Sequence, residues 1–111
     1  MNIIGVDFDE AACLAVWPFE GDRLESVVVL KDRIVRARKL HRCCDCHEQI
    51  QPLERSRQMV AIIDGEFGES RWCSRCCAAM AASREDNGAA MEARAALGRE
   101  NFERLRLKGE A

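Results

Sequence analysis

Two pairs of cysteines have the spacing of metal ligands. Cys43 and Cys46 form one C-x-x-C pair, Cys73 and Cys76 form another, and 26 residues separate the pairs. Two residues between ligands let a tight backbone turn direct two thiolates at one ion about 2.3 Å away, and the second pair completes a tetrahedron. Four sulfur ligands leave no coordination position open, so the pattern predicts one Zn²⁺ ion with a structural and not a catalytic role.

Other side chains near these pairs keep further alternatives open. Cys44, His47 or Cys77 could replace one of the four ligands in a shifted set. A dithiol redox site would need the βαβ context of thioredoxin-like proteins, which the sequence does not show. Cysteines packed in a core without metal are the remaining alternative, and Cys13 is interpreted as such a small core residue. Nearby donors that could supply hydrogen bonds to the sulfur atoms are His41, Arg42 and Arg75.

The sequence between and after the cysteine pairs predicts the elements that position them. Residues 57–63 and 69–73 flank the turn signal DGEFG and predict a β-hairpin. After Cys73 the run CCAAMAASRE has the alanine-rich composition of a helix, which Asn87-Gly88 interrupts. Apolar or small residues then recur at helical spacing and predict a C-terminal amphipathic helix to about Lys108. They are Met91, Ala95, Gly98, Phe102 and Leu105.

The order of knuckle, β-hairpin and helix is that of a treble clef, and the residues carry a further resemblance. Residues 41–54 read H-R-C-C-D-C-x-x-x-I-x-P-x-E, and W-C-S-R-C follows the predicted hairpin. Over about residues 41–80 this resembles the LIM-like treble-clef zinc modules of small phage and bacterial proteins. The resemblance implies the same four cysteine ligands, Ile50 under the knuckle, and a binding platform for nucleic acid or protein. Leu53 stands where the pattern has glycine, and no tyrosine follows Glu54.

The N-terminal part of the chain predicts a different unit. Residues 2–8, 12–17 and 25–30 are short, rich in Val and Ile, and separated by turn signals, which predicts an antiparallel β-meander. The expected fold class is therefore α+β. The expected organisation is a meander with a basic connector at 1–40, the zinc module at 41–84 and the C-terminal helix at 85–111.

Two carboxylates at the N-terminus suggest a second resemblance. The stretch IIGVDFDEAACLAVW, with Asp7 after an apolar run, resembles the opening strands of RNase H-like nucleases, including RuvC-type resolvases. A Mg²⁺-dependent nuclease needs several carboxylates converging on one or two ions, and Asp7 and Asp9 are followed by too little chain before Cys43 to supply them. The resemblance implies at most a remnant of such a nuclease, and a polar turn over residues 7–10 is the simpler interpretation.

Charge is segregated along the chain although the net charge is only −2. Residues 1–30 hold six acids and one base (net −5), and residues 31–42 hold six bases and one acid (net +5). Such a basic run could follow a phosphate backbone, or it could pair with the acidic N-terminal segment. The candidate nucleic-acid-binding residues are Lys31, Arg33, Arg36, Arg38, Lys39 and Arg42.

The remaining features define the expected class of protein. The N-terminus lacks the pattern of a secretory signal, and no stretch approaches the roughly 18 apolar residues of a membrane span. We therefore expect a cytoplasmic protein with reduced thiols and no membrane association. We expect a binding module and not an enzyme, either a nucleic-acid-associated adaptor or a protein-interaction or inhibitor-type module. The C-terminal helix could also form a homodimer.

Overall fold

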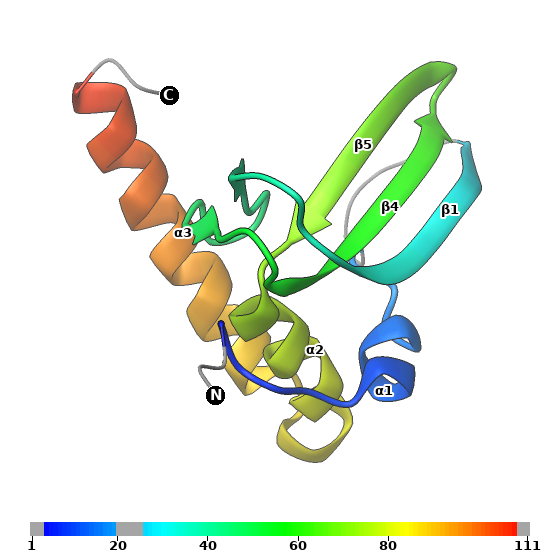
Figure 1. Ribbon diagram of the computed structural model, residues 1–111, viewed down its shortest axis with the longest axis horizontal. Helices are drawn as coiled ribbons and strands as arrows, with labels where there is room; N and C mark the ends of the chain where they lie inside the picture. Colours follow the sequence, from blue (N-terminus) through cyan, green and yellow to red (C-terminus); the bar gives the residue numbers. More distant parts are fainter. Residues whose placement is uncertain (1–3, 20–25, 109–111) are drawn as a thin grey trace.

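The computed structural model describes residues 4–19 and 26–108, which contain three helices and two antiparallel sheets. Figure 1 shows the larger sheet on one side, α3 on the other, and α2 with the small β2–β3 sheet between them. The predicted mixed α+β class, with antiparallel sheets and a C-terminal helix, is confirmed. The elements are α1 (Glu10–Leu14), β1 (Val27–Arg36), β2 (His41–Arg42), β3 (Gln49–Ile50), β4 (Arg55–Ile63), β5 (Glu66–Trp72), α2 (Ser74–Asp86) and α3 (Ala89–Leu107).

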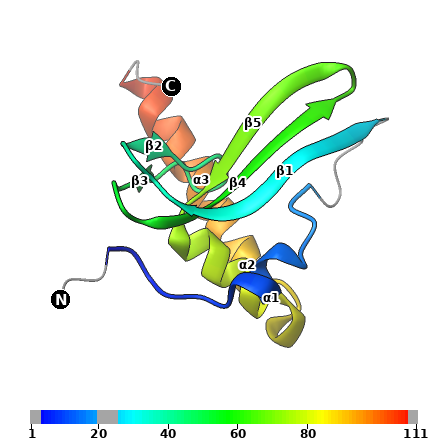
Figure 2. The same cartoon turned by 45° about the vertical axis from the view of Figure 1, so that its right-hand side comes forward.

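The larger sheet has the order β1-β4-β5, with β4 in the middle (Figure 2). The predicted β-hairpin is confirmed as β4 and β5, which pair from Arg57 opposite Trp72 to Ile63 opposite Glu66. Its turn is tighter than DGEFG suggests, because only Asp64 (φ 49°) and Gly65 (φ 86°) adopt positive φ. Two such residues are what a two-residue hairpin loop requires, so the strands can continue to the turn on both sides.

The core lies between the inner face of this sheet and the helices α1 and α2. Met59 and Ala61 of β4 point into it, and Cys13 of α1 and Met80 of α2 meet them from the helical side.

The buried side chain of Arg57 joins two strands of the sheet to α1. The Arg57 side chain is 1% exposed; its Nε and Nη2 each donate to the Asp32 carboxylate at 2.8 Å, and its Nη1 donates to the carbonyl oxygen of Cys13 at 3.0 Å. Burial lowers the pKa of Arg57, but the hydrogen bonds that it donates to Asp32 and the negative charge of that carboxylate together help to raise the pKa above its ordinary value. The only acid within the basic run is thus used inside the protein.

The predicted N-terminal β-meander is wrong in its first two strands. The described part of the first stretch, residues 4–8, forms no strand, and residues 10–14 form α1 instead of a second strand. The Asp9 side chain accepts a hydrogen bond from the Ala12 amide and caps this helix, which outweighs the weak strand pattern of a short apolar run. The third stretch begins β1, which pairs with β4. The remaining residues of the meander, 2–3, 20–24 and 25, lie outside the described residues.

The two C-terminal helices are confirmed where the sequence predicts them. Asn87 (φ 56°) and Gly88 (φ 80°) end α2 and begin α3, because both adopt the left-handed conformation that terminates a helix. The apolar stripe of α3 packs on α2 and on the loop of the first cysteine pair. No helix within residues 4–19 or 26–108 has both the length and the apolar character needed to cross a membrane.

Candidate metal centre

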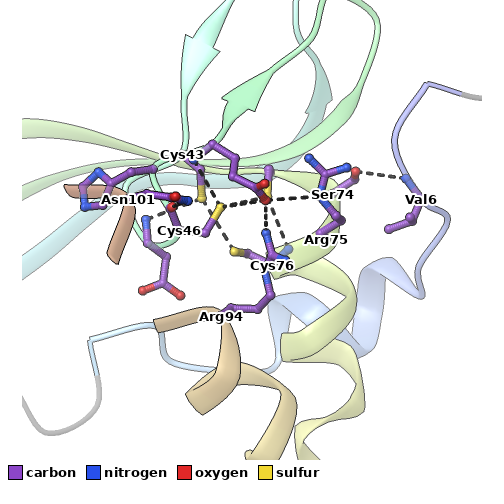
Figure 3. Close-up of polar contacts among 12 residues, drawn as sticks. Val6, Cys43, Cys46, Ser74, Arg75, Cys76, Arg94 and Asn101 are labelled. Carbon is purple, nitrogen blue, oxygen red and sulfur yellow. Dashed lines mark hydrogen bonds and ion pairs between the residues drawn. The ribbon is translucent and has the colours of Figure 1, made fainter. Parts of the chain in front are cut away.

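The structure brings Cys43, Cys46, Cys73 and Cys76 together in one buried cluster. All four Sγ atoms lie within 4.8 Å of one another, with Cys46 and Cys73 at 3.6 Å and Cys43 and Cys76 at 3.7 Å. Figure 3 shows the side chains of Cys43, Cys46 and Cys76 directed toward one another. Ligands about 2.3 Å from an ion at the corners of a tetrahedron are about 3.8 Å apart. The four cysteines could therefore hold a metal ion with little rearrangement.

The first pair is positioned by a tight turn between β2 and β3. The Cys43 amide donates to the Glu48 carbonyl at 2.9 Å, and the His47 amide donates to the Cys43 carbonyl at 3.1 Å. The amides of Asp45 and Glu48 point at the sulfur atoms of Cys43 and Cys46, at 3.5 and 3.4 Å. Backbone N–H groups directed at sulfur favour the thiolate form, which is the form that binds metal.

The second pair is positioned by the N-terminus of α2. Cys73 is the N-cap residue, and its Sγ accepts a hydrogen bond from the Cys76 amide at 3.4 Å. The positive end of the helix dipole lies at this terminus and stabilises negative charge on both sulfur atoms. The predicted placement of this pair in the first turn of the alanine-rich helix is confirmed.

A buried carboxylate ties the loop after β3 to the same helix end. Glu54 Oε2 accepts hydrogen bonds from the amide and the hydroxyl of Ser74, both at 2.8 Å, and its Oε1 accepts one from the Gln51 amide at 3.0 Å. The Ser74 hydroxyl in turn accepts a hydrogen bond from the Val6 amide at 3.0 Å (Figure 3). The N-terminal segment passes so close that a Cβ on Gly5 would lie 2.3 Å from Ser74 Oγ. Glu54 therefore links the loop after β3 to the helix end that carries the second cysteine pair, and Ser74 links that helix end to the N-terminal segment.

Helix α3 contributes a cation to the cluster from far along the sequence. Arg94 Nη2 forms an ion pair with Glu48 Oε1, which also accepts a hydrogen bond from Cys46 Sγ at 3.7 Å. The sulfur atoms of Cys76 and Cys46 also lie near enough to influence the Arg94 guanidinium. Burial lowers the pKa of Arg94, but its interactions with Cys76, Glu48 and Cys46 together raise it by more. Arg94 is thus a permanent positive charge beside sulfur atoms that would be negative with a metal bound.

Two further residues of α3 hold the turn of the first pair. Asn101 Nδ2 donates to the carbonyl oxygen of Cys46 at 2.9 Å, and the backbone at Gly98 lies directly against Asp45. Residues 94, 98 and 101 lie on one face of the helix, so a single stripe makes all these contacts. Neither Arg94 nor Asn101 was among the donors expected from the sequence.

Hydrogen bonds within the cluster separate the thiol pKa values. Bonds with Cys43 and then with Cys73 lower the pKa of Cys46 far below its ordinary value. Bonds with Cys43 and Cys46 instead raise the pKa of Cys76.

The three residues of the shifted ligand set lie outside the cluster. Cys44 is exposed, and Cys77, one residue after a member of the cluster, points the other way and donates to the Trp72 carbonyl at 3.5 Å. His47 has φ 60°, and its ring lies 5.5 Å from that of Phe102. His41 pairs with Ile50 across the β2–β3 sheet, and Ile50 is fully buried beneath the turn.

The other donors expected near the sulfur atoms act on the backbone or through Glu48. Arg42 Nη1 donates to the His47 carbonyl at 2.6 Å, and Arg75 Nε donates to Glu48 Oε1 at 3.4 Å. Both residues therefore support the turn without touching a cysteine in the described structure.

The six cations of the basic run are spread over three segments. Lys31, Arg33 and Arg36 lie on β1, Arg38 and Lys39 lie in the connection to β2, and Arg42 lies in β2. All six are exposed, and none forms an ion pair with an acid of residues 4–19 or 26–108. The hydrogen bonds that hold three of them go to neutral oxygens, which belong to Gln58, Leu53 and His47.

The N-terminal carboxylates serve structural contacts. Asp7 and Glu10 both pair with Arg55, at 2.5 and 2.7 Å, and Asp9 caps α1. The strand that would end at Asp7 in an RNase H-like arrangement is absent from residues 4–9. In the described structure the acidic segment therefore neutralises Arg55 and not the basic run.

Fold and site together define a small mixed α+β protein whose four buried cysteines could hold a metal ion. Comparisons with models of protein families, with curated proteins and with solved structures find no match to this chain. The chemistry of the site must therefore be argued from its own residues.

Proposed function

We propose that Cys43, Cys46, Cys73 and Cys76 bind one structural zinc ion. The supporting observation is the set of four buried sulfur atoms at nearly tetrahedral spacing, with backbone amides and Arg94 placed to stabilise their negative charge. Zinc is favoured among metals because four thiolates from two C-x-x-C pairs are a typical structural ligand set for this ion. Turn, hairpin and ligand-bearing helix follow one another as in a treble clef, which agrees with the LIM-like resemblance of residues 41–80.

The ligand set can be tested by cobalt substitution. Cobalt(II) bound by thiolates has sulfur-to-metal charge-transfer absorption whose intensity increases with the number of thiolates. The wild-type protein is expected to show the intensity of four thiolates, Cys46→Ser to lose part of it, and Cys44→Ser to keep it. Equal loss in both variants would contradict the proposed set.

We propose further that this zinc module binds the phosphate backbone of a nucleic acid and is not an enzyme. The observation that carries the proposal is that the six cations of residues 31–42 remain exposed and unpaired with acids in the described structure. A basic run neutralised by the N-terminal acids would favour a solvated connector instead. Of the N-terminal acids within residues 4–19, Asp7 and Glu10 pair with Arg55 and Asp9 caps α1, which leaves the cations available to phosphates.

Salt-dependent binding tests this function. Fluorescence anisotropy with a labelled DNA oligonucleotide is expected to show binding at about 50 mM salt and a steep loss of affinity at higher salt. Replacing Arg36, Arg38 and Lys39 together by Gln should weaken binding and reduce the salt slope. Absence of binding at about 50 mM salt would contradict the proposal.

A protein-interaction module is the second candidate, and one surface favours it. Val28, Leu30 and Phe67 are exposed on β1 and β5 toward the hairpin end of the sheet, which projects away from α2 and α3 (Figure 2). Exposed apolar side chains gathered at one end of a sheet are typical of protein contacts. This candidate predicts a partner whose binding is lost in Phe67→Glu and is insensitive to the Arg36, Arg38 and Lys39 substitutions. A homodimer through α3 stays a prediction, to be tested by light scattering.

A further inference from the structure

A cleft lies between the turn of the first cysteine pair and the C-terminal half of α3. Its volume is about 380 Å³, and α3, α2 and the β2–β3 region contribute to its walls. The polar residues that line it and carry the argument are Arg42, His47, Glu48, Arg75, Arg104 and Lys108.

The cleft concentrates positive charge from three separate parts of the chain. Arg42 comes from β2, Arg75 from α2, and Arg104 and Lys108 from the end of α3, and all four are exposed. The one acid in the lining is Glu48, which is already bonded to Arg94 and Arg75. The negative end of the helix dipole favours cations at the C-terminus of α3, which explains the positions of Arg104 and Lys108. It does not explain why Arg42 and Arg75 converge on the same cleft.

An aromatic surface adjoins these cations. His47 lines the cleft, and its ring lies 5.5 Å from the ring of Phe102, which is 47% exposed although it is a large apolar side chain. A groove with cations for phosphates and an exposed aromatic ring for bases is the arrangement that binds single strands, because only unpaired bases offer their faces for stacking.

We infer that this cleft binds single-stranded nucleic acid. Arg42, Arg75, Arg104 and Lys108 contact phosphate groups, and a base stacks on the His47–Phe102 pair. The inference rests on the proposed nucleic-acid function and locates the contact beside the zinc module. Arg42 belongs both to the cleft and to the basic run, so a strand could continue from one to the other.

The test uses the full-length zinc-loaded protein and a fluorescein-labelled oligothymidylate of about 12 nucleotides, with a duplex of equal length for comparison. The double variant Arg104→Gln/Lys108→Gln is expected to reduce the slope of log Kd against log salt by about 1.4, or 0.7 for each lost phosphate contact. The matched control is Arg84→Gln/Arg99→Gln, which removes two exposed arginines elsewhere on α2 and α3 and lowers the net charge equally. It should leave the slope nearly unchanged.

Stacking is tested separately. Phe102→Leu is expected to weaken binding roughly 5- to 100-fold, the range for one base stacked on an aromatic side chain. Phe67→Leu alters an even more exposed phenylalanine, in β5, and should have little effect.

The outcomes separate this inference from the function on which it rests. If the cleft variants bind like their controls, or if the duplex binds more tightly than the single strand, the cleft is not the site. Nucleic-acid binding would then still stand if the Arg36, Arg38 and Lys39 substitutions abolish it. If the wild-type protein binds no nucleic acid at about 50 mM salt, both the function and the inference are wrong.

Discussion

Gly98 of α3 lies directly against the backbone of Asp45, which belongs to the turn between Cys43 and Cys46. A Cβ added at Gly98 would lie 1.8 Å from the Asp45 carbonyl oxygen, far inside van der Waals contact. Because the helix approaches this closely, Arg94 and Asn101 on the same stripe can reach Glu48 and the Cys46 carbonyl. The C-terminal helix is therefore part of the four-cysteine site.

This contact predicts that Gly98→Ala destabilises the protein. The new methyl group meets backbone atoms that cannot rotate away, so α3 must shift, at a cost of roughly 2 kcal/mol in the free energy of unfolding. The change would be measured by denaturant unfolding of the zinc-loaded protein.

Gly68→Ala is the matched control, because a Cβ at Gly68 meets no atom within 4 Å. It should change stability by less than about 0.5 kcal/mol. Equal stability of Gly98→Ala and the wild-type protein would show that α3 does not pack on the turn in this way.

Removing the positive charge of Arg94 should weaken metal binding. Arg94→Met keeps most of the side-chain volume but removes the ion pair with Glu48 and the positive charge near Cys46 and Cys76, and loss of such an outer contact typically costs about 10- to 100-fold in metal affinity. Competition with a chromophoric chelator measures this affinity. Arg99→Met, on the exposed side of the same helix, should retain wild-type affinity, and Arg94→Lys should recover part of the loss. Indistinguishable affinities for Arg94→Met and Arg99→Met would rule out this role.

The parts of the fold that could be predicted are those specified by local chemistry. The C-x-x-C pairs, the Asp64-Gly65 turn and the Asn87-Gly88 break each determine their own backbone geometry, and the structure has them where the sequence places them. The segment 4–14 could not be predicted this way. Its short apolar runs suit a strand or a helix, and the Asp9 cap and the burial of Cys13 favour the helix.

In the candidate site, too, the residues specified by local sequence could be predicted and those brought in by tertiary packing could not. Its four cysteines follow from spacing, whereas Arg94 is one of several arginines in the C-terminal part of the chain, with nothing in its neighbours to distinguish it. The one available signal was Gly98, because a glycine inside an alanine-rich helix often marks a close approach of another backbone. Which backbone approaches it depends on tertiary packing.

Leu53 is a position where a substitution should stabilise the protein. Its φ is 72°, a left-handed conformation that costs a residue with a Cβ about 1–2 kcal/mol, and its side chain is 60% exposed. Leu53→Gly should therefore raise the free energy of unfolding by roughly 0.5–1 kcal/mol, after allowing for the greater entropy of the unfolded chain.

The control for that change is Leu40→Gly. Leu40 is 53% exposed and does not have a positive φ, so the substitution only adds flexibility and should destabilise the protein. Thermal unfolding compares the stability of the two variants with that of the wild-type protein. A decrease in stability for Leu53→Gly would contradict the proposed backbone strain at this residue.

The ion pair between Arg57 and Asp32 should matter far more than the pair between Arg55 and Asp7. Asp32→Ala leaves a buried guanidinium without its carboxylate and is expected to cost roughly 3 kcal/mol. Asp7 is 85% exposed, so Asp7→Ala should cost less than about 1 kcal/mol. Urea unfolding measures the free energy of unfolding of both variants. Similar losses of stability in the two would contradict the burial of the Arg57–Asp32 ion pair.

The most direct test of the proposed centre is the metal content of the purified protein together with its stability after metal removal. Elemental analysis should find about one zinc per chain in the wild-type protein and in Cys44→Ser, and much less in Cys46→Ser. A strong chelator should lower the unfolding temperature of the wild-type protein sharply, because metal binding supplies folding free energy in small zinc modules. A Cys46→Ser protein that keeps its zinc and its unfolding temperature would contradict the four-cysteine site.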